Sequence, residues 1–342
     1  LVIAFILGFI MFRYWDRIKF VGRLMELSSS VVLREKGTIL STLLSIVINF
    51  YTLITMSFTN LFIADYVLMI TRNTEYGYYT WIILEFFGLW TITFIATFFN
   101  AIIVGITHDW YRSPNVDVAS FGRGLKRASK VQGGLAIYAF IVSVLKILVE
   151  IAKSQAKSQK ERGGAGAVLA ALAMLIAYIL DIALELFRFF SFFIVPAMVI
   201  RETNFKDGFK ESLSKLRDLF IEVIASEIGF GKVAGFFAFM YLMLLGGIGY
   251  VIGAYVVTPI FLIQYNVPAM TVGIISAAIF FLAGLIPASV IFSTLSVVFN
   301  TLLYEYGVDL EFARKGESLP RNMPSDVEKE FVEILKERGI SI

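Results

Sequence analysis

Residues 168–200 read VLAALAMLIAYILDIALELFRFFSFFIVPAMVI, an apolar stretch that contains only three charged side chains. About 20 such residues in a helix cross the hydrocarbon core of a bilayer, because the helix satisfies its own backbone groups where no water is present. This stretch is longer than that minimum, so it can tilt in the bilayer or project from it. It therefore predicts a membrane-spanning helix.

Composition extends this prediction to the whole chain. Of its 342 residues, 58% are hydrophobic and 17% are charged, and the mean hydropathy is +0.78. A soluble domain carries about 25% charged residues, which excludes a water-soluble protein. The predicted spans are 38–64, 79–107, 135–151, 168–200, 233–257 and 270–304. We therefore predict an all-α integral membrane protein with a six-helix transmembrane core.

An internal repeat organises these spans. The string GLKRASK at 124–130 resembles GFKESLSK at 208–215, and GRLMELS at 22–28 is a weaker third copy. Each copy lies in a segment with apolar residues at helical spacing and precedes two spans, which predicts three units of an amphipathic helix followed by a hairpin. The predicted order is 1–12, a partial N-terminal hydrophobic helix; 13–37, an interfacial amphipathic helix; 38–107, hairpin 1; 108–134, an amphipathic connector; 135–200, hairpin 2; 201–229, an amphipathic connector; 230–304, hairpin 3; and 305–342, an acidic cytoplasmic tail. For 1–12, a membrane-dipping segment or a trimmed signal peptide stays open.

Basic residues set the predicted orientation. They are frequent in the segments before the first span and after the second and fourth spans, so these segments and the tail are expected in the cytoplasm of a multi-pass cell membrane protein. The basic linker at 153–164 conflicts with this topology. The residues expected to contact lipid headgroups are Arg123, Lys126, Arg127, Lys130, Lys206, Lys210, Lys215 and Arg217. The alternative is that the connectors rest on the helix bundle.

Charged residues inside the spans are costly and are therefore candidate functional residues. Asp181, Glu185 and Arg188 follow one another at i, i+4 and i+7, so they share a helix face on which Arg188 can pair with Glu185. Lys146 and Glu150 form an i, i+4 pair in the preceding span. One interpretation is a proton or ion path with an unpaired Asp181. The alternative is a network of ion pairs that holds the helices in register, or charges that reach the membrane surface.

Other chemistry has little support in the sequence. The chain has no cysteine and one histidine, His108, which excludes disulfides, thiolate metal sites and clustered-histidine catalysis within it. A net charge of +3 does not indicate nucleic-acid binding, and no GxxxxGK[ST], HExxH or GxSxG motif is present. We predict no cofactor and no metal. Gly249 and Gly253 have the small-xxx-small spacing that predicts close helix packing.

Several strings resemble a family of uncharacterised archaeal and bacterial polytopic membrane proteins. They are FFNAIIVG at 98–105, GLKRASK at 124–130, FFIVPAMV at 192–199 and FKDGFKES at 205–212. The chain is also distantly similar to the membrane domain attached to some glycerophosphodiester phosphodiesterases, in which a similar Phe-x-Val-Pro stretch precedes an amphipathic helix rich in Gly and Ala. This resemblance implies a six-helix core and no particular activity.

Three functions remain in order of preference. The first is a non-enzymatic integral scaffold or assembly subunit, which acts through its amphipathic helices on membrane lipids as a homo-oligomer or within a larger complex. The alternative is a transporter or channel with a polar path around Asp181, Glu185 and Arg188. An enzyme acting on lipid is third, because isolated carboxylates without a metal or nucleophile are weak support for catalysis.

Overall fold

The computed structural model of the chain describes residues 15–113, 120–161, 165–259, 268–317, 320–322, 324, 327–329, 332–333 and 336. Every regular element within these ranges is a helix, which confirms the all-α prediction. The prediction for 1–12 lies outside the described residues. The elements are α2 (Trp15–Arg34), α3 (Lys36–Thr71), α4 (Thr74–Arg112), α5 (Phe121–Lys130), α6 (Gln132–Glu161), α7 (Ala165–Phe190), α8 (Ile194–Arg201), α9 (Phe205–Asp218), α10 (Phe220–Ile252), the π-helical turn η2 (Gly253–Val257) and α12 (Ala269–Arg314).

Six helical stretches are long and apolar enough to cross a membrane, which confirms the predicted six-helix core. They include α3, α4 and α12, which have 36, 39 and 46 residues. At 1.5 Å per residue these helices measure about 54 to 69 Å, roughly twice the thickness of the hydrocarbon core. Each helix is therefore long enough to extend beyond the hydrocarbon, where polar side chains are easier to accommodate.

The fourth predicted span is broken near its end. A turn at Ser191–Phe193 separates α7 from α8. Ser212 of α9 bonds both sides of this break: its hydroxyl donates to the Phe190 carbonyl at 2.9 Å and accepts from the Phe193 N–H at 3.1 Å. The side chain thereby replaces helical hydrogen bonds that the turn removes.

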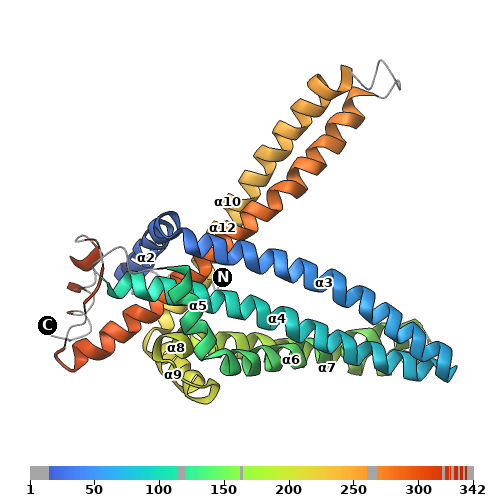
Figure 1. Ribbon diagram of the computed structural model, residues 1–342, viewed down its shortest axis with the longest axis horizontal. Coiled ribbons are helices and arrows are strands. Elements are labelled where there is room, and N and C mark those ends of the chain that lie inside the picture. Colours follow the sequence, from blue (N-terminus) through green and yellow to red (C-terminus); the bar gives the residue numbers. More distant parts are fainter. Residues whose placement is uncertain are drawn as a thin grey trace. The chain divides into compact units, whose positions relative to one another are not determined.

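The chain divides into two compact units. Unit 1 contains α2, α10, η2 and α12 up to Phe299, whereas unit 2 contains α3 to α9 and α12 from Asn300. In unit 1, α10 and α12 run side by side (Figure 1). A Cβ atom at Gly249 would lie 2.7 Å from the Cβ of Phe280, and one at Gly253 would lie 2.6 Å from the Cβ of Ser276. The predicted close packing at these two glycines is confirmed.

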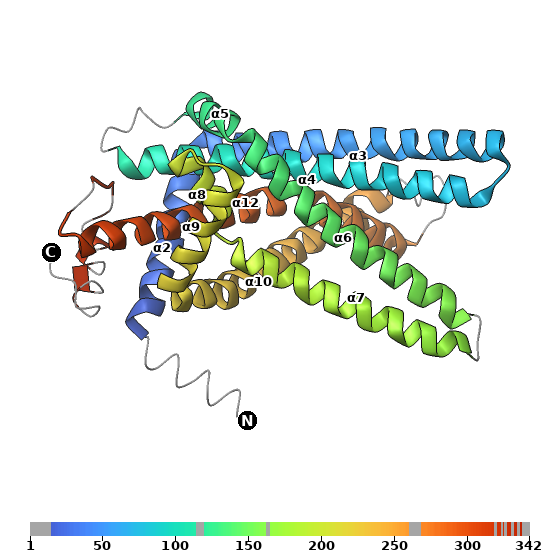
Figure 2. The same ribbon diagram turned by 90° about the horizontal axis from the view of Figure 1, so that it is seen from below.

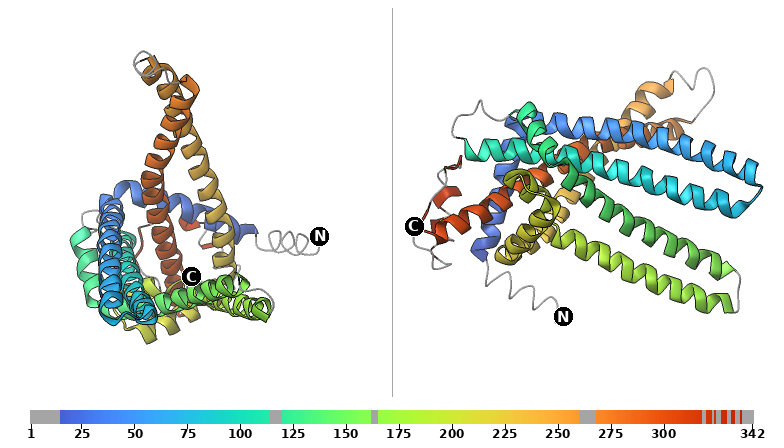
Figure 3. Two further views of the ribbon diagram at one scale, coloured as in Figure 1. Left: turned by 90° about the vertical axis from the view of Figure 1, so that its right-hand side faces the viewer. Right: turned by 60° about the horizontal axis from the view of Figure 1, so that its bottom comes forward.

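Unit 2 is built from two hairpins, α3 with α4 and α6 with α7, and their helices run side by side (Figure 2). Both hairpins extend away from the end of the unit that contains α5, α8 and α9 (Figure 3). Helix α5 packs on α4 through backbone contact, because a Cβ atom at Gly124 would lie only 2.5 Å from the Ile102 carbonyl oxygen. A Cβ atom at Gly208 of α9 would likewise lie 2.5 Å from the Cγ atom of Met198 in α8. By contrast, a Cβ atom at Gly22, in the weaker third copy, would have no neighbour within 4 Å.

Candidate functional site

The last turns of α12 bury an unusual number of polar side chains. Tyr304 and Glu305 are 0% exposed and Asp309 is 3% exposed. Buried carboxylates are strongly unfavourable unless cations and hydrogen bonds compensate them. Helical spacing puts Glu305 and Asp309 on one face of α12, and Tyr304 and Glu311 on another. Each face needs its own partners.

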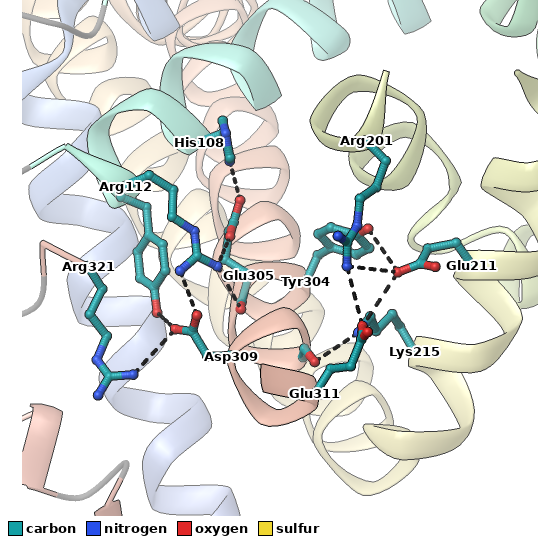
Figure 4. Close-up of polar contacts among 12 residues, drawn as sticks. His108, Arg112, Arg201, Glu211, Lys215, Tyr304, Glu305, Asp309, Glu311 and Arg321 are labelled. Carbon is teal, nitrogen blue, oxygen red and sulfur yellow. Dashed lines mark hydrogen bonds and ion pairs between the residues drawn. The ribbon is translucent and has the colours of Figure 1, made fainter. Parts of the chain in front are cut away.

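Helix α4 supplies the partners of the first face (Figure 4). Arg112 Nη1 donates to Asp309 Oδ1 at 2.6 Å, and its Nη2 donates to the Glu305 carboxylate. His108 Nδ1 pairs with the other oxygen of Glu305, while the Tyr111 hydroxyl donates to Asp309 Oδ2 at 2.7 Å. Because His108 and Arg112 are one helical turn apart, they reach the same carboxylate from one side of α4.

Residues 321 and 322, beyond the end of α12, also contact this first face and its partners. The backbone N–H of Asn322 donates to the Tyr111 carbonyl at 2.7 Å. This bond positions the neighbouring Arg321, whose Nη1 lies 3.7 Å from Asp309 Oδ2. Asp309 therefore lies between two guanidinium groups and one phenol.

Helices α8 and α9 supply the partners of the second face. Lys215 is 3% exposed, and its ammonium group donates to Glu311 Oε2 at 2.8 Å and to the Gly307 carbonyl at 3.0 Å. Arg201 Nη2 also donates to Glu311 Oε2, at 3.3 Å. The Tyr304 hydroxyl donates to Glu211 Oε1 at 3.3 Å. We call the whole set the α12 charge network: His108, Tyr111, Arg112, Arg201, Glu211, Lys215, Tyr304, Glu305, Asp309, Glu311 and Arg321.

A smaller set of ion pairs joins α5 to its neighbours. Arg127 Nη2 donates to Asp109 Oδ1 of α4 at 2.9 Å. Lys130 Nζ donates to both oxygens of Glu202, at 2.7 and 2.8 Å. Hydrogen bonding to Lys130 holds the pKa of Glu202 below its ordinary value, and the nearby Arg127 charge acts in the same direction. These contacts fix α5 against the ends of α4 and α8.

The structure corrects part of the predicted lipid contacts. Lys215 is buried against α12, so its assignment as a lipid contact is wrong. Arg127 and Lys130 bind carboxylates of the protein itself. The reason is that the polar faces of α5 and α9 meet acidic residues from α4, α8 and α12, which periodicity within one helix does not reveal. The other predicted contacts are exposed and stay a prediction: Arg123, Lys126, Lys206, Lys210 and Arg217.

The charged residues of hairpin 2 form local pairs. Arg188 Nη1 lies 2.6 Å from Glu185 Oε1, which confirms the predicted pair. The prediction that Asp181 is unpaired is wrong, because Lys153 Nζ lies 2.9 Å from its Oδ2. Lys153 was assigned to a polar linker, but α6 continues as a helix to Glu161 and carries it opposite Asp181.

The paired charged side chains of hairpin 2 are exposed on the surface of unit 2. Lys153 and Asp181 have side chains 47% and 43% exposed, and those of Arg188 and Glu185 are 44% and 68% exposed. Among the described residues, no ion pair joins Lys146 to Glu150, and Glu150 is exposed. The charged side chains of hairpin 2 are therefore not enclosed within unit 2. That they form a polar path through the membrane stays a prediction.

Sequence reasoning missed the α12 charge network. It ended the sixth span at 304 and assigned 305–342 to an acidic tail, whereas α12 continues to Arg314. The available signal was the string LLYEYGVDL at 302–310, in which apolar residues continue between two acids spaced i, i+4 and no proline interrupts them. In the described part of the chain, no group of three His, Asp or Glu side chains has the geometry to hold a metal ion.

A comparison with known protein families found a match. The profile of one family, described as plasma-membrane choline transporter, matches residues 1–311. The match includes five complete spans and the sixth as far as Glu311, and with it the α12 charge network through that residue. No functionally curated protein matches the sequence significantly.

This match overturns two predictions. The resemblance to uncharacterised prokaryotic membrane proteins and to the phosphodiesterase-attached membrane domain is wrong, because the family profile that matches residues 1–311 is that of the choline transporters. The scaffold hypothesis is also wrong, because the matched family is one of transporters. The family and the six spans together indicate a multi-pass protein of the cell membrane. With residues 1–311 of its 342 in the match, the chain belongs to the plasma-membrane choline transporter family.

Proposed function

We propose that this chain transports choline or a closely related quaternary ammonium cation across the cell membrane. The observation that carries the proposal is the family match over residues 1–311, which includes five complete spans and the sixth as far as Glu311. Buried polar structure in the same core supports it, because transporters need interactions that can differ between two arrangements of their helices.

We propose that the end of unit 2 that contains α5, α8 and α9 faces the cytoplasm. Exposed basic side chains on α5 and α9 support this orientation, because such residues are retained on the cytoplasmic side. The α12 charge network then lies at the inner ends of α4 and α12. Its ion pairs hold α4, α8, α9 and α12 together in the arrangement seen here.

Uptake by proteoliposomes tests the proposal. Purified full-length protein is reconstituted, and uptake of radiolabelled choline is measured against protein-free liposomes of the same lipid. We expect saturable uptake that excess unlabelled choline suppresses. The neutral analogue 3,3-dimethyl-1-butanol, which has the shape of choline without its charge, should not suppress it. Uptake equal to that of empty liposomes would refute the proposal.

A further inference from the structure

A groove opens between α3 and α4 near their connecting turn at Arg72 and Asn73. Its volume is about 620 Å³, within the range of roughly 300 to 1,000 Å³ that is typical of small-molecule sites. We call it the hairpin groove and define it by six of its lining residues: Phe58, Phe62, Asp65, Thr74, Tyr78 and Trp81. It lies within unit 2.

Helical spacing explains why these side chains meet. Phe58, Phe62 and Asp65 follow at i, i+4 and i+7 on α3. Thr74, Tyr78 and Trp81 follow at the same spacing on α4. Each set therefore forms a stripe on one helix face, and the two stripes face each other across the groove. The groove is therefore lined by one carboxylate and four aromatic side chains.

The carboxylate of Asp65 differs from those of the α12 charge network in its surroundings. Among the described residues, no lysine, arginine or histidine lies within ion-pair distance of it, whereas every acidic residue of the α12 charge network has one. An acidic side chain beside apolar rings is better stabilised when a cation binds next to it. Asp65 is exposed, so a cation from outside the protein can reach it.

Asn60 of α3 and Glu85 of α4 form a polar contact further along the hairpin. Asn60 is 4% exposed, and its Nδ2 donates to Glu85 Oε2 at 3.4 Å. Its Oδ1 is buried and has no hydrogen-bond partner among the described residues. Asn60 precedes Asp65 by five residues, or about 7.5 Å along the helix. Asn60 does not line the groove, and five residues turn it about 140° from Asp65 around the helix, so the contacts available to a ligand are those of the groove side chains.

We infer that the hairpin groove binds a quaternary ammonium group, with its methyl groups against the rings of Trp81, Tyr78 and Phe58 and its charge beside Asp65. A quaternary nitrogen has no N–H to donate, so aromatic faces and a carboxylate provide the recognition it can use. An aromatic belt at the membrane surface explains exposed Tyr and Trp residues. It does not explain an acidic residue among the aromatic side chains that line the groove. This inference rests on the proposed function and locates a binding site for its substrate class.

Equilibrium binding to the purified full-length chain tests the inference. The chain is placed in nanodiscs of phosphatidylglycerol and phosphatidylethanolamine, which contain no choline group, and titrated with radiolabelled choline or tetramethylammonium. Trp81→Leu should weaken binding roughly 2- to 30-fold, the range of a cation–π contact. Asp65→Asn should weaken it about fivefold or more, the effect of one charge at close range in water.

Matched variants control for position and charge. Tyr76→Leu removes an exposed aromatic ring on α4, and Glu75→Gln removes a carboxylate near the same turn; neither side chain lines the groove. Both should bind choline within about twofold of wild type, since neither contacts the ligand. Trp81→Phe should retain part of the affinity lost in Trp81→Leu. Circular dichroism and gel filtration verify that each variant is folded.

The outcomes separate this inference from the proposed function. Folded Trp81→Leu and Asp65→Asn proteins that bind both probes like wild type overturn the inference, even if wild-type proteoliposomes take up choline. Groove-dependent binding without uptake supports the inference and refutes transport.

Phosphatidylcholine added to the nanodiscs shows whether the quaternary ammonium group that binds comes from a lipid headgroup or from a free cation. Competition with choline identifies a lipid headgroup as an occupant, and absence of competition restricts the site to the free cation. A wild-type chain that binds neither probe overturns the inference.

Discussion

The hairpin groove and the α12 charge network lie near opposite ends of α4 and use charge in different ways. Trp81 in the groove and Arg112 in the network are separated by about 46 Å along the helix. In the network, Glu305 and Asp309 are buried and each is bound by at least one cation. In the groove, Asp65 is exposed and has no cationic partner among the described residues.

This difference shows which acidic residues are available to a ligand. A carboxylate already bound by a guanidinium group stabilises the packing of helices, and removing its partner leaves an uncompensated buried charge. A carboxylate without a partner retains its capacity to bind a cation. We therefore assign a mainly structural role to Glu305 and Asp309, and a ligand-binding role to Asp65.

The largest expected effect comes from removing the central cation of the network. Arg112→Met removes the guanidinium group that binds Glu305 and the nearer of the two beside Asp309, and should lower the free energy of unfolding by about 3 to 5 kcal/mol. Arg188→Met, in the exposed pair with Glu185, is the matched control and should cost at most about 1 kcal/mol. Unfolding by sodium dodecyl sulfate in mixed micelles measures both. Equal losses would contradict the distinction between buried and exposed pairs.

A smaller effect is expected where α5 packs on α4. In Gly124→Ala, the new methyl group lies 2.5 Å from the Ile102 carbonyl oxygen, so α5 must move. We expect a loss of about 1 to 3 kcal/mol in the same assay. Gly122→Ala, on the same helix with no neighbour within 4 Å, should be stabilising by up to about 1 kcal/mol because alanine favours helix. If both substitutions have the same effect, the close approach of the helices is refuted.

The contribution of Glu202, an exposed residue after α8, to the free energy of unfolding should depend weakly on pH. The pKa of Glu202 is lowered in the folded chain, mainly by Lys130, so folding favours its charged form. Its stabilisation is complete above the ordinary pKa of glutamate and is lost as pH falls through the lowered value. The difference between wild type and Glu202→Gln in unfolding free energy should therefore shrink from pH 7 to pH 3, by no more than about 0.5 kcal/mol after solvent screening. In a Lys130→Met background this pH dependence should become smaller, because only the weaker effect of nearby charges such as Arg127 remains.

The smallest effect is expected from the charges of hairpin 2. Asp181 is paired with Lys153 at an accessible position, as are Glu185 and Arg188 with each other. Asp181→Asn should therefore leave choline uptake by proteoliposomes within about twofold of wild type, because exposed pairs contribute little. Loss of uptake by a folded Asp181→Asn protein would place this residue in the transport path and weaken the assignment to the hairpin groove.

Part of the polar structure could be predicted because it is local. The Glu185 and Arg188 pair follows from i, i+3 spacing in one helix. The Lys153 and Asp181 pair was missed because it depends on how far α6 continues beyond its apolar stretch. The contacts of Arg112 with Glu305 and Asp309 join residues 193 and 197 positions apart. No pattern within a single helix indicates such partners.

The sequence by itself determined the number of spans, the all-helical class and the close packing at Gly249 and Gly253. Hydropathy and helical spacing act over one or two helices, and the bilayer makes an internally bonded helix the only stable form for such stretches. Only the tertiary structure decided which carboxylates are bound by cations, and that Asp65 has no cationic partner in the described part of the chain. An ion pair between two helices forms only when packing brings those helices together, and the packing of helices that are distant in the chain depends on the whole fold.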